Sequence, residues 1–238
     1  MKTIGIIGGM SAESTRIYYD RLNSETRRRL GGLHSADVII RSLDFAPIAE
    51  LQAAGRWDEA GRVLAAAARG LEAAGAEILL LATNTMHKVA AAIETVATVP
   101  FVHIADATAE RIVAAGCRRP ALIATRFTME EDFYVGRLRQ RFGLEVMVPE
   151  ADERAMVHRV IYDELCLGMV VDRSRLAYED LARRLIERGA DGIILGCTEV
   201  GMLLNAANVA APVFDTSLIH VDAALDLALA EVVRAAAE

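Results

Sequence analysis

Short apolar runs alternate along the chain with longer stretches in which apolar residues recur at helical spacing. The runs are rich in Ile, Val and Leu, are bounded by turn residues, and occupy residues 3–9, 36–43, 76–84, 99–106, 120–126, 144–150, 191–198 and 211–217. Continuous apolar runs of this kind are typical of parallel strands that are buried on both faces. Strands that alternate with helices therefore predict an α/β fold with parallel sheets and right-handed crossovers.

The same pattern occurs twice. TIGIIGGMSAEST matches PALIATRFTMEED in placement, ILLLATNTMHK matches GIILGCTEVGM, and VPFVHIADAT matches APVFDTSLIH. This repeat predicts two similar parallel-sheet sandwich domains related by a pseudo-two-fold axis, with the active site in the cleft between them. Because the last strand of each copy precedes the helix that leads into the other, we expect one domain from 1–99 plus 212–238 and the other from 100–211. A single doubly wound domain is the alternative interpretation.

Composition narrows the possible functions. The chain has 238 residues and a formal net charge of -7, which gives no reason to expect binding to nucleic acid or an anionic membrane. The first apolar run is too short for a signal sequence or a membrane-spanning helix. Three cysteines without a CxxC motif indicate reduced thiols in a cytoplasmic protein. The lysines are Lys2 and Lys88 alone, so a pyridoxal-phosphate mechanism, which needs a lysine, is disfavoured.

Two polar clusters follow apolar runs at matching points of the repeat. Thr83, Asn84 and Thr85 form the first, and Cys197, Thr198 and Glu199 form the second. Ligands of open parallel sheets bind beyond the carboxyl ends of strands, and a helix beginning there favours a carboxylate and lowers the pKa of a thiol. Two groups on opposite faces of one carbon, with N–H donors for the developing enolate, would suit racemisation.

These residues belong to a longer pattern. The segments GIIGGMSAESTRIYY (5–19), ATNTMHK (82–88), FVHIADAT (101–108), IATRFTMEEDFY (123–134) and LGCTEVGMLL (195–204) resemble the cofactor-independent aspartate/glutamate racemases, in their amino-acid racemase branch, over essentially the whole chain. The family has a cysteine in each cluster, whereas Thr83 replaces the first cysteine here. The resemblance implies an amino-acid substrate, no cofactor, and a homodimer.

The expected roles follow from the residue types. Cys197 is the expected acid/base for one face of the α-carbon. Thr83, or a water molecule that it holds, is expected to remove the proton from the other face poorly, because a hydroxyl is a very weak acid and is rarely ionised at neutral pH. We therefore expect turnover biased toward one enantiomer, the L form by resemblance. The expected substrate-binding residues include Met10 and Ser11 in a Gly-Gly turn that could hold an anion, together with Asn84, Thr85, Thr125, Thr128, Thr198 and Glu199. Helix capping is the alternative role for Asn84, Thr85 and Thr198, and a plain tight turn is the alternative for Met10 and Ser11. A helix-dipole interaction is the alternative for Glu199.

Other positions bear on the substrate. Aspartate-specific members of the family have cations where this chain has Gln52 and Cys166, so an acidic side chain would be held by Gln52, backbone donors or Arg126. Cys166 is expected to be a small buried residue and Cys117 an incidental residue of a surface turn. His87 is expected to be solvated, and the remaining histidines lack the spacing of metal ligands, which predicts no metal site.

Three alternatives remain open beside an aspartate/glutamate-type racemase. One is a racemase with a broad range of amino-acid substrates. Another is an enzyme similar to arylmalonate decarboxylase or maleate isomerase, because one cysteine is enough to protonate one face of an enediolate. The third is an amino-acid-binding protein without catalytic activity, in which the absence of the first cysteine marks the loss of turnover.

Overall fold

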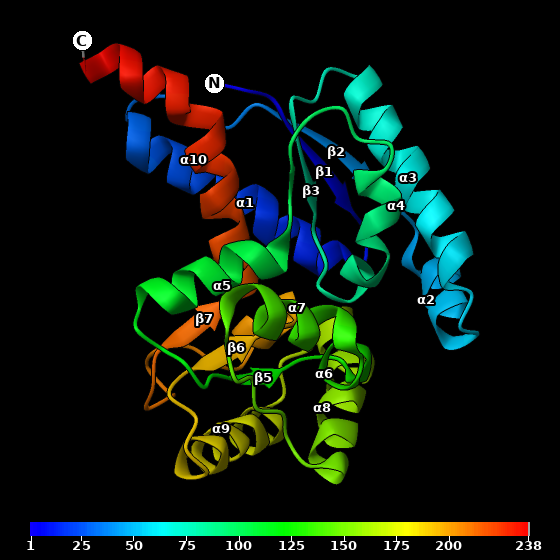
Figure 1. The fold of residues 1–238 in the computed structure, drawn as a ribbon, viewed down its shortest axis with the longest axis vertical. Coiled ribbons are helices and arrows are strands. Elements are labelled where there is room, and N and C mark those ends of the chain that lie inside the picture. Colours follow the sequence, from blue (N-terminus) through cyan, green and yellow to red (C-terminus); the bar gives the residue numbers. More distant parts are fainter. Residues whose placement is uncertain (238) are drawn as a thin grey trace. The chain divides into compact units, whose positions relative to one another are not determined.

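The computed structural model describes residues 1–237, which form two compact units (Figure 1). Unit 1 contains Met1–His103 and the chain from His220 onward, and unit 2 contains Ile104–Ile219. Both units contain a parallel sheet and helices, so the predicted α/β class is confirmed. The pseudo-two-fold relation stays a prediction.

Unit 1 has a sheet in which the strand order is β2-β1-β3-β4, and every pair is parallel. Its elements are β1 (Ile4–Gly8), α1 (Ala12–Leu30), β2 (Val38–Ser42), α2 (Phe45–Ala53), α3 (Trp57–Ala73), β3 (Ile78–Leu81), the 3₁₀ helix η1 (Thr85–Val89), α4 (Ala90–Glu94), β4 (Phe101–Val102) and most of α10 (Thr216–Ala237).

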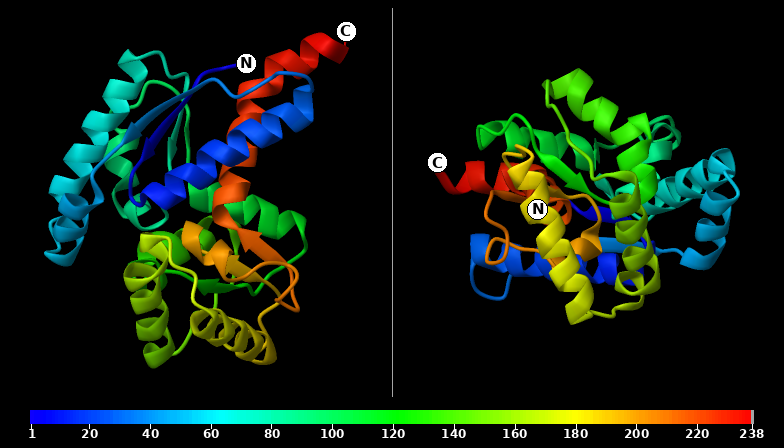
Figure 2. Two further views of the ribbon diagram at one scale, coloured as in Figure 1. Left: turned by 180° about the vertical axis from the view of Figure 1, so that it is seen from behind. Right: turned by 90° about the horizontal axis from the view of Figure 1, so that it is seen from below.

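Successive side chains of the central strands of unit 1 point to opposite faces of the sheet, and apolar residues form a layer on each face. Ile7, Leu79 and Leu81 pack with residues of α2 and α3 on one face. On the opposite face, Ile4, Ile6, Ile78 and Leu80 pack with residues of α1 and α10. Figure 2 shows α1 and α10 side by side along this face. Both faces of the central strands β1 and β3 are therefore buried, as the continuous apolar runs predict, whereas the edge strand β2 is largely exposed.

Unit 2 has a sheet in the order β5-β6-β7, also parallel throughout. Its elements are α5 (Ile104–Ala114), β5 (Ala121–Ile123), α6 (Arg126–Glu130), α7 (Asp132–Phe142), α8 (Ala151–Asp163), the 3₁₀ helix η2 (Leu165–Leu167), α9 (Asp172–Glu187), β6 (Ile193–Leu195), the 3₁₀ helix η3 (Thr198–Met202) and β7 (Val213–Asp215).

The apolar run at 144–150 differs from its prediction. It forms one isolated bridge, between Met147 and Ala121, and no strand. Two residues later the chain reaches Pro149, which has no N–H to donate to a ladder, and α8 begins soon afterwards.

The units divide later in the chain than the predicted boundaries after residues 99 and 211. β4 pairs with β3 in unit 1, and β7 pairs with β6 in unit 2. Each last strand therefore completes the sheet of its own unit. The chain passes to the other unit only after that strand, at His103 and at Ile219.

A buried histidine in unit 1 links α1, β4 and α10. The ring Nε2 of His220 lies 2.7 Å from the carbonyl oxygen of Val102, and Nδ1 lies 2.8 Å from the Tyr18 hydroxyl. A carbonyl can only accept, so Nε2 carries the proton and Nδ1 accepts from the tyrosine. Burial lowers the pKa of His220 from 6.5 to about 4.

This histidine makes folding stability depend on pH. Its folded-state pKa is the lower one, so its contribution is complete above about pH 6.5 and is lost as the pH falls toward about 4. We expect a loss of about 2 kcal/mol of unfolding free energy between about pH 7.5 and about pH 5. Urea unfolding at both pH values should show a smaller loss in His220→Gln than in the wild type. The exposed His34 offers the control His34→Gln, and an unchanged loss in His220→Gln would contradict the prediction.

Candidate active site

The turn after β1 is shaped by close backbone packing. Gly9 has φ +88°, and a Cβ there would lie 2.0 Å from the carbonyl oxygen of Leu43, so only glycine fits. The Gly9 N–H donates to Thr15 Oγ1 at 2.7 Å. Met10 and Ser11 follow and are buried, and Ser11 Oγ caps α1 by accepting from the Ser14 N–H at 3.2 Å. Ser11 therefore has a structural role as the N-cap of α1, which was not anticipated from the sequence.

The turn after β3 lies beside the turn after β1. β1 and β3 are paired, with Ile7 opposite Leu81, and the Ser14 hydroxyl donates to the carbonyl oxygen of Ala82 at 2.7 Å. Thr83, Asn84 and Thr85 follow directly and are buried. The structure thus brings five predicted residues of unit 1 to one edge of the sheet, namely Met10, Ser11, Thr83, Asn84 and Thr85.

Gln52 also reaches this region. It is buried on α2, and its Nε2 lies 2.9 Å from the sulfur of Met86, which directly follows Thr85. The helix that begins here is the short η1, and its N-cap residue Asn84 makes no side-chain capping hydrogen bond. The capping alternative therefore does not apply to Asn84.

His87 corrects a prediction from the sequence. It is buried rather than solvated, and its Nδ1 donates to the carbonyl oxygen of Thr83 at 2.8 Å. The His87 ring lies edge-on to the ring of His103, with their centroids 4.5 Å apart. The imidazole thus fixes the backbone at the position where the family has its first cysteine.

In unit 2, Gly196 sets the position of the thiol. A Cβ on Gly196 would lie 2.4 Å from Leu122 Cδ1, so glycine is required where the end of β6 passes β5. Cys197 is the next residue, is half-buried, and lies at the N-terminus of η3. Thr198 and Glu199 follow and are buried.

The carboxylate of Glu199 accepts hydrogen bonds from three side chains. The Cys197 thiol donates to its Oε2 at 2.9 Å, and the Thr198 hydroxyl donates to the same atom at 2.5 Å. The Cys166 thiol donates to Oε1 at 3.7 Å. The Glu199 carboxylate therefore contacts the Cys197 thiol, and the Thr198 hydroxyl contacts the same carboxylate.

These contacts reverse the pKa shift expected for Cys197. A helix N-terminus was expected to lower its pKa, but burial, the negative charge of Glu199 and the nearby Cys166 together raise it well above its usual range. The helix that follows is a 3₁₀ helix from Thr198 to Met202, too short to offset this cost. The resting sulfur is therefore a thiol, and the carboxylate beside it is placed to accept its proton.

One helical stripe beside this cluster was missed from the sequence. His158, Tyr162 and Cys166 lie four residues apart, on α8 and η2. The rings of His158 and Tyr162 have centroids 4.7 Å apart. Burial raises the pKa of Tyr162, and the charges of Cys197, Cys166 and Glu199, when these groups are ionised, raise it further. The spacing of four residues was the signal that could have identified the stripe.

The turn after β5 holds the other two predicted residues of unit 2. Thr125 and Thr128 are buried, and their hydroxyl oxygens are 3.1 Å apart. β5 pairs with β6, with Ile123 opposite Leu195, so both threonines and Cys197 follow neighbouring strand ends. Cys117 precedes β5 at the opposite edge, is buried rather than in a surface turn, and donates to the carbonyl oxygen of Asp191 at 3.4 Å.

Comparison with known proteins decides the family. The model of the family Asp/Glu/hydantoin racemase matches residues 7–224. The chain belongs to this racemase family. A Yersinia pestis protein provisionally described as an Asp/Glu racemase is 49% identical, with a TM-score of 0.89 and with 96% of this chain and 100% of that one covered. An aspartate racemase homologue from Pyrococcus horikoshii is 36% identical, with a TM-score of 0.83 and with 96% and 99% covered. The expected enzyme class, an isomerase of the racemase type, is confirmed.

The same fold also occurs in another kind of enzyme. A double mutant of arylmalonate decarboxylase is 19% identical, with a TM-score of 0.58 and with 96% of this chain and 93% of that one covered. At this identity the likeness concerns the fold alone, which hosts more than one chemistry.

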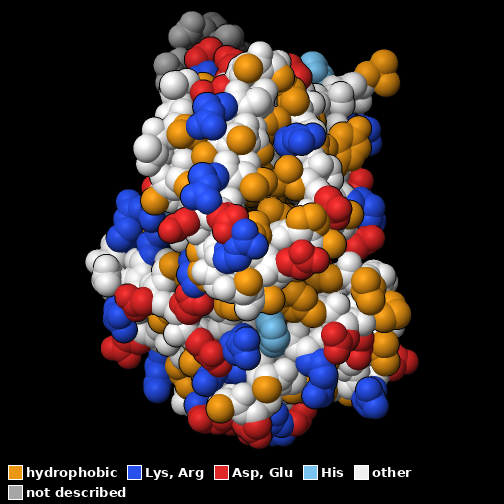
Figure 3. Space-filling view, turned by 90° about the vertical axis from the view of Figure 1, so that its right-hand side faces the viewer, with side chains coloured by type: hydrophobic (Ala, Val, Ile, Leu, Met, Phe, Trp, Pro, Cys, Tyr) orange, Lys and Arg blue, Asp and Glu red, His pale blue; other side chains and the backbone are white. Residues whose placement is uncertain are grey.

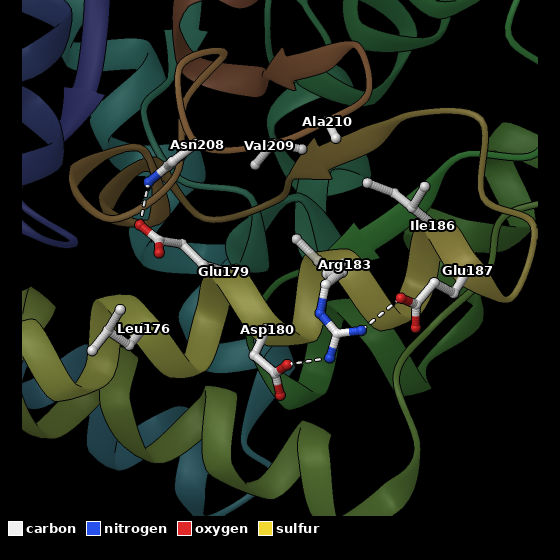
Figure 4. A pocket seen from close by; sticks show the side chains of 10 residues that line it. Leu176, Glu179, Asp180, Arg183, Ile186, Glu187, Asn208, Val209 and Ala210 are labelled. Carbon is white, nitrogen blue, oxygen red and sulfur yellow. Dashed lines mark hydrogen bonds and ion pairs between the residues drawn. The ribbon is translucent and has the colours of Figure 1, made fainter.

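Surface features of this racemase family member lie apart from the clusters. A pocket of about 450 Å³ lies between α9 and residues 208–210 of unit 2, and none of the predicted site residues lines it. Its charged rim is paired internally, since Arg183 contacts Asp180 and Glu187 (Figure 4). On the face drawn in Figure 3, acidic and basic side chains are interspersed.

Within residues 1–237, no group of three or more His, Cys, Asp or Glu side chains is arranged to hold a metal ion. No helix in the same part of the chain is long and apolar enough to cross a membrane.

Proposed function

We propose that this protein is an amino-acid racemase of the aspartate/glutamate type that works without pyridoxal phosphate. In this proposal Cys197 and Thr83 exchange protons with opposite faces of one α-carbon. The observation that supports it best is the 2.9 Å contact between the Cys197 thiol and the Glu199 carboxylate at a strand end of a racemase family member. A thiol with its own proton acceptor is what abstraction of an α-proton requires.

The proton transfers begin with the Cys197 thiol and the Glu199 carboxylate. Glu199 accepts the thiol proton, and the resulting thiolate removes the α-proton of the substrate, leaving a carbanion stabilised by its carboxylate as an enolate. If the thiol first exchanges this proton with solvent, reprotonation from the same sulfur returns the starting enantiomer with a solvent-derived hydrogen. Reprotonation from Thr83, or from a water molecule that it holds, gives the other enantiomer, and that group then regains a proton from solvent while Glu199 releases the one it accepted. Because the pKa of Cys197 is raised, the thiolate exists only while the carboxylate holds its proton.

Thr83 makes removal of the α-proton unequal for the two enantiomers. A threonine hydroxyl, or a water molecule held by it, can donate a proton to a carbanion but is too weak an acid to act as a standing base at neutral pH. Abstraction therefore proceeds well only from the face that Cys197 addresses, which we assign to the L enantiomer on the family resemblance. Buried residues of the two clusters and their neighbours hold the rest of the amino acid, namely the apolar Met10 and the polar Ser11, Gln52, Asn84, Thr85, Thr125, Thr128 and Thr198.

A single-cysteine decarboxylase or isomerase is the second candidate. It is favoured by one observation, the presence of a thiol in one cluster and a hydroxyl in the other. A racemase of broad substrate range and a binding protein without turnover are further alternatives, which the same experiment separates.

Solvent-deuterium exchange tests the proposed function. Each pure enantiomer of the common amino acids, together with arylmalonates and maleate, is incubated with the protein in D₂O and followed by NMR. We expect deuterium at the α-carbon of acidic L-amino acids and no loss of carboxylate from the malonates. Decarboxylation, or isomerisation of maleate, would select the second candidate. Binding without exchange would select the binding protein.

The resemblance also implies a homodimer in the cytoplasm, and we include both in the proposal. The three free cysteines of unit 2 suit a reducing compartment. Analytical ultracentrifugation of the full chain measures the oligomeric state, and a monomer at micromolar concentration would overturn the dimer.

A further inference from the structure

Arg126 lies at the same sheet edge as the thiol of unit 2. It follows Thr125 directly after β5, and Ile123 of β5 is paired with Leu195 of β6, two residues before Cys197. The residue is exposed, and its backbone N–H donates to His158 Nδ1 at 3.3 Å. His158 begins the stripe that continues through Tyr162 to Cys166.

Unlike neighbouring arginines of unit 2, Arg126 has no carboxylate partner for its guanidinium among residues 1–237. Arg154 is paired with Glu130, and Arg137 is paired with Asp106. Arg126 forms no ion pair among the side chains that the structure describes, and the Cζ of its guanidinium lies 5.7 Å from the centroid of the Phe127 ring. Its bonding positions are thus available to a ligand.

The charge of Arg126 reaches the thiol cluster. It lowers the pKa of Tyr162, opposing burial and the charges that Cys197, Cys166 and Glu199 carry when they are ionised, all of which raise that pKa. It also lowers the pKa of His158, after the larger effect of burial, so that this imidazole is neutral near pH 7. Within this group of side chains Arg126 is therefore the permanent cation.

A substrate with a second carboxylate needs such a cation. Gln52 and Cys166 are neutral, whereas a guanidinium binds a carboxylate through two parallel N–H donors. We propose that Arg126 binds the distal carboxylate of a dicarboxylic amino acid and so determines specificity for acidic substrates. This inference rests on the proposed function and assigns its substrate class.

Substitution of Arg126 gives a direct test. In Arg126→Gln we expect kcat/KM for α-deuterium exchange with L-aspartate and L-glutamate to fall roughly 10- to 100-fold, because a hydrogen-bonded charge pair is lost. Exchange with L-asparagine, L-glutamine and L-alanine should stay within a few-fold of the wild type. Arg126→Lys should retain part of the preference for acidic substrates. The control Arg118→Gln removes an exposed arginine that precedes β5, at the opposite sheet edge.

The outcomes separate this inference from the proposed function. An equal loss for all substrates would overturn it, because Arg126 would then bind the shared α-carboxylate or support the fold. No loss for acidic substrates would overturn it as well. If the wild type exchanged no α-proton, the proposed function would fail, and calorimetry would decide the inference separately. Wild type should then bind L-aspartate or L-glutamate more tightly than Arg126→Gln does, and equal binding would overturn it.

Discussion

Replacement of Cys197 by serine will lower α-proton exchange with L-amino-acid substrates by about 10²- to 10⁴-fold, the usual contribution of a positioned acid/base group. A serine hydroxyl can still donate to Glu199 but cannot provide a comparable base near neutral pH. Binding of the amino acid, measured by calorimetry, should change only a few-fold, since the sulfur acts on the α-proton.

A second thiol provides the control for this result. Cys117 is buried in the same unit but lies before β5, and Cys117→Ser should keep wild-type exchange. Exchange that survives in Cys197→Ser would show that another group removes the α-proton. Loss of binding together with loss of exchange would assign the sulfur to substrate binding.

Under the proposed function, replacement of Thr83 by cysteine will speed removal of the α-proton from the D enantiomer. The wild type should exchange the α-proton of the L enantiomer at least about 10²-fold faster than that of the D enantiomer, because one face meets only a hydroxyl. In Thr83→Cys the D enantiomer should gain exchange by a similar factor. NMR of each pure enantiomer in D₂O measures both rates.

Thr83→Ser is the matched control, since it keeps a hydroxyl of similar acidity and should keep the one-sided exchange. Equal exchange from both enantiomers in the wild type would contradict the assignment of Thr83 as the weak partner. Failure of Thr83→Cys to gain any exchange, in a folded protein that still binds substrate, would place the second proton donor elsewhere.

The strand ends were predictable because buried parallel strands leave a strong signal. The runs before Thr83 and before Cys197 became β3 and β6, since continuous apolar residues can be buried on both faces of a sheet. The run that contains Met147 is equally apolar but makes a single bridge. Pairing depends on which strand lies alongside, and composition alone does not specify that.

The chemistry of the clusters was less predictable. The pKa of Cys197 depends on the direction in which the Glu199 side chain turns, and a sequence motif does not contain a rotamer. His87 was expected in solvent because it lies one turn from the cluster, yet its ring bonds the backbone of Thr83. Arg126 was one of several candidates for an acidic substrate, and its position beside the stripe that begins at His158 separates it from the others.

The contact between Cys197 and Glu199 has a further consequence for the survival of the enzyme between turnovers. Oxidants and alkylating agents attack thiolates much faster than thiols. A sulfur that stays protonated beside a negative carboxylate is therefore a poor target for such agents. The arriving substrate carries a positive ammonium group, which would offset that negative charge and favour ionisation when a proton is to be moved. Under the proposed function, the sulfur is thus a resistant thiol while the site is empty and becomes a reactive thiolate only when substrate is bound.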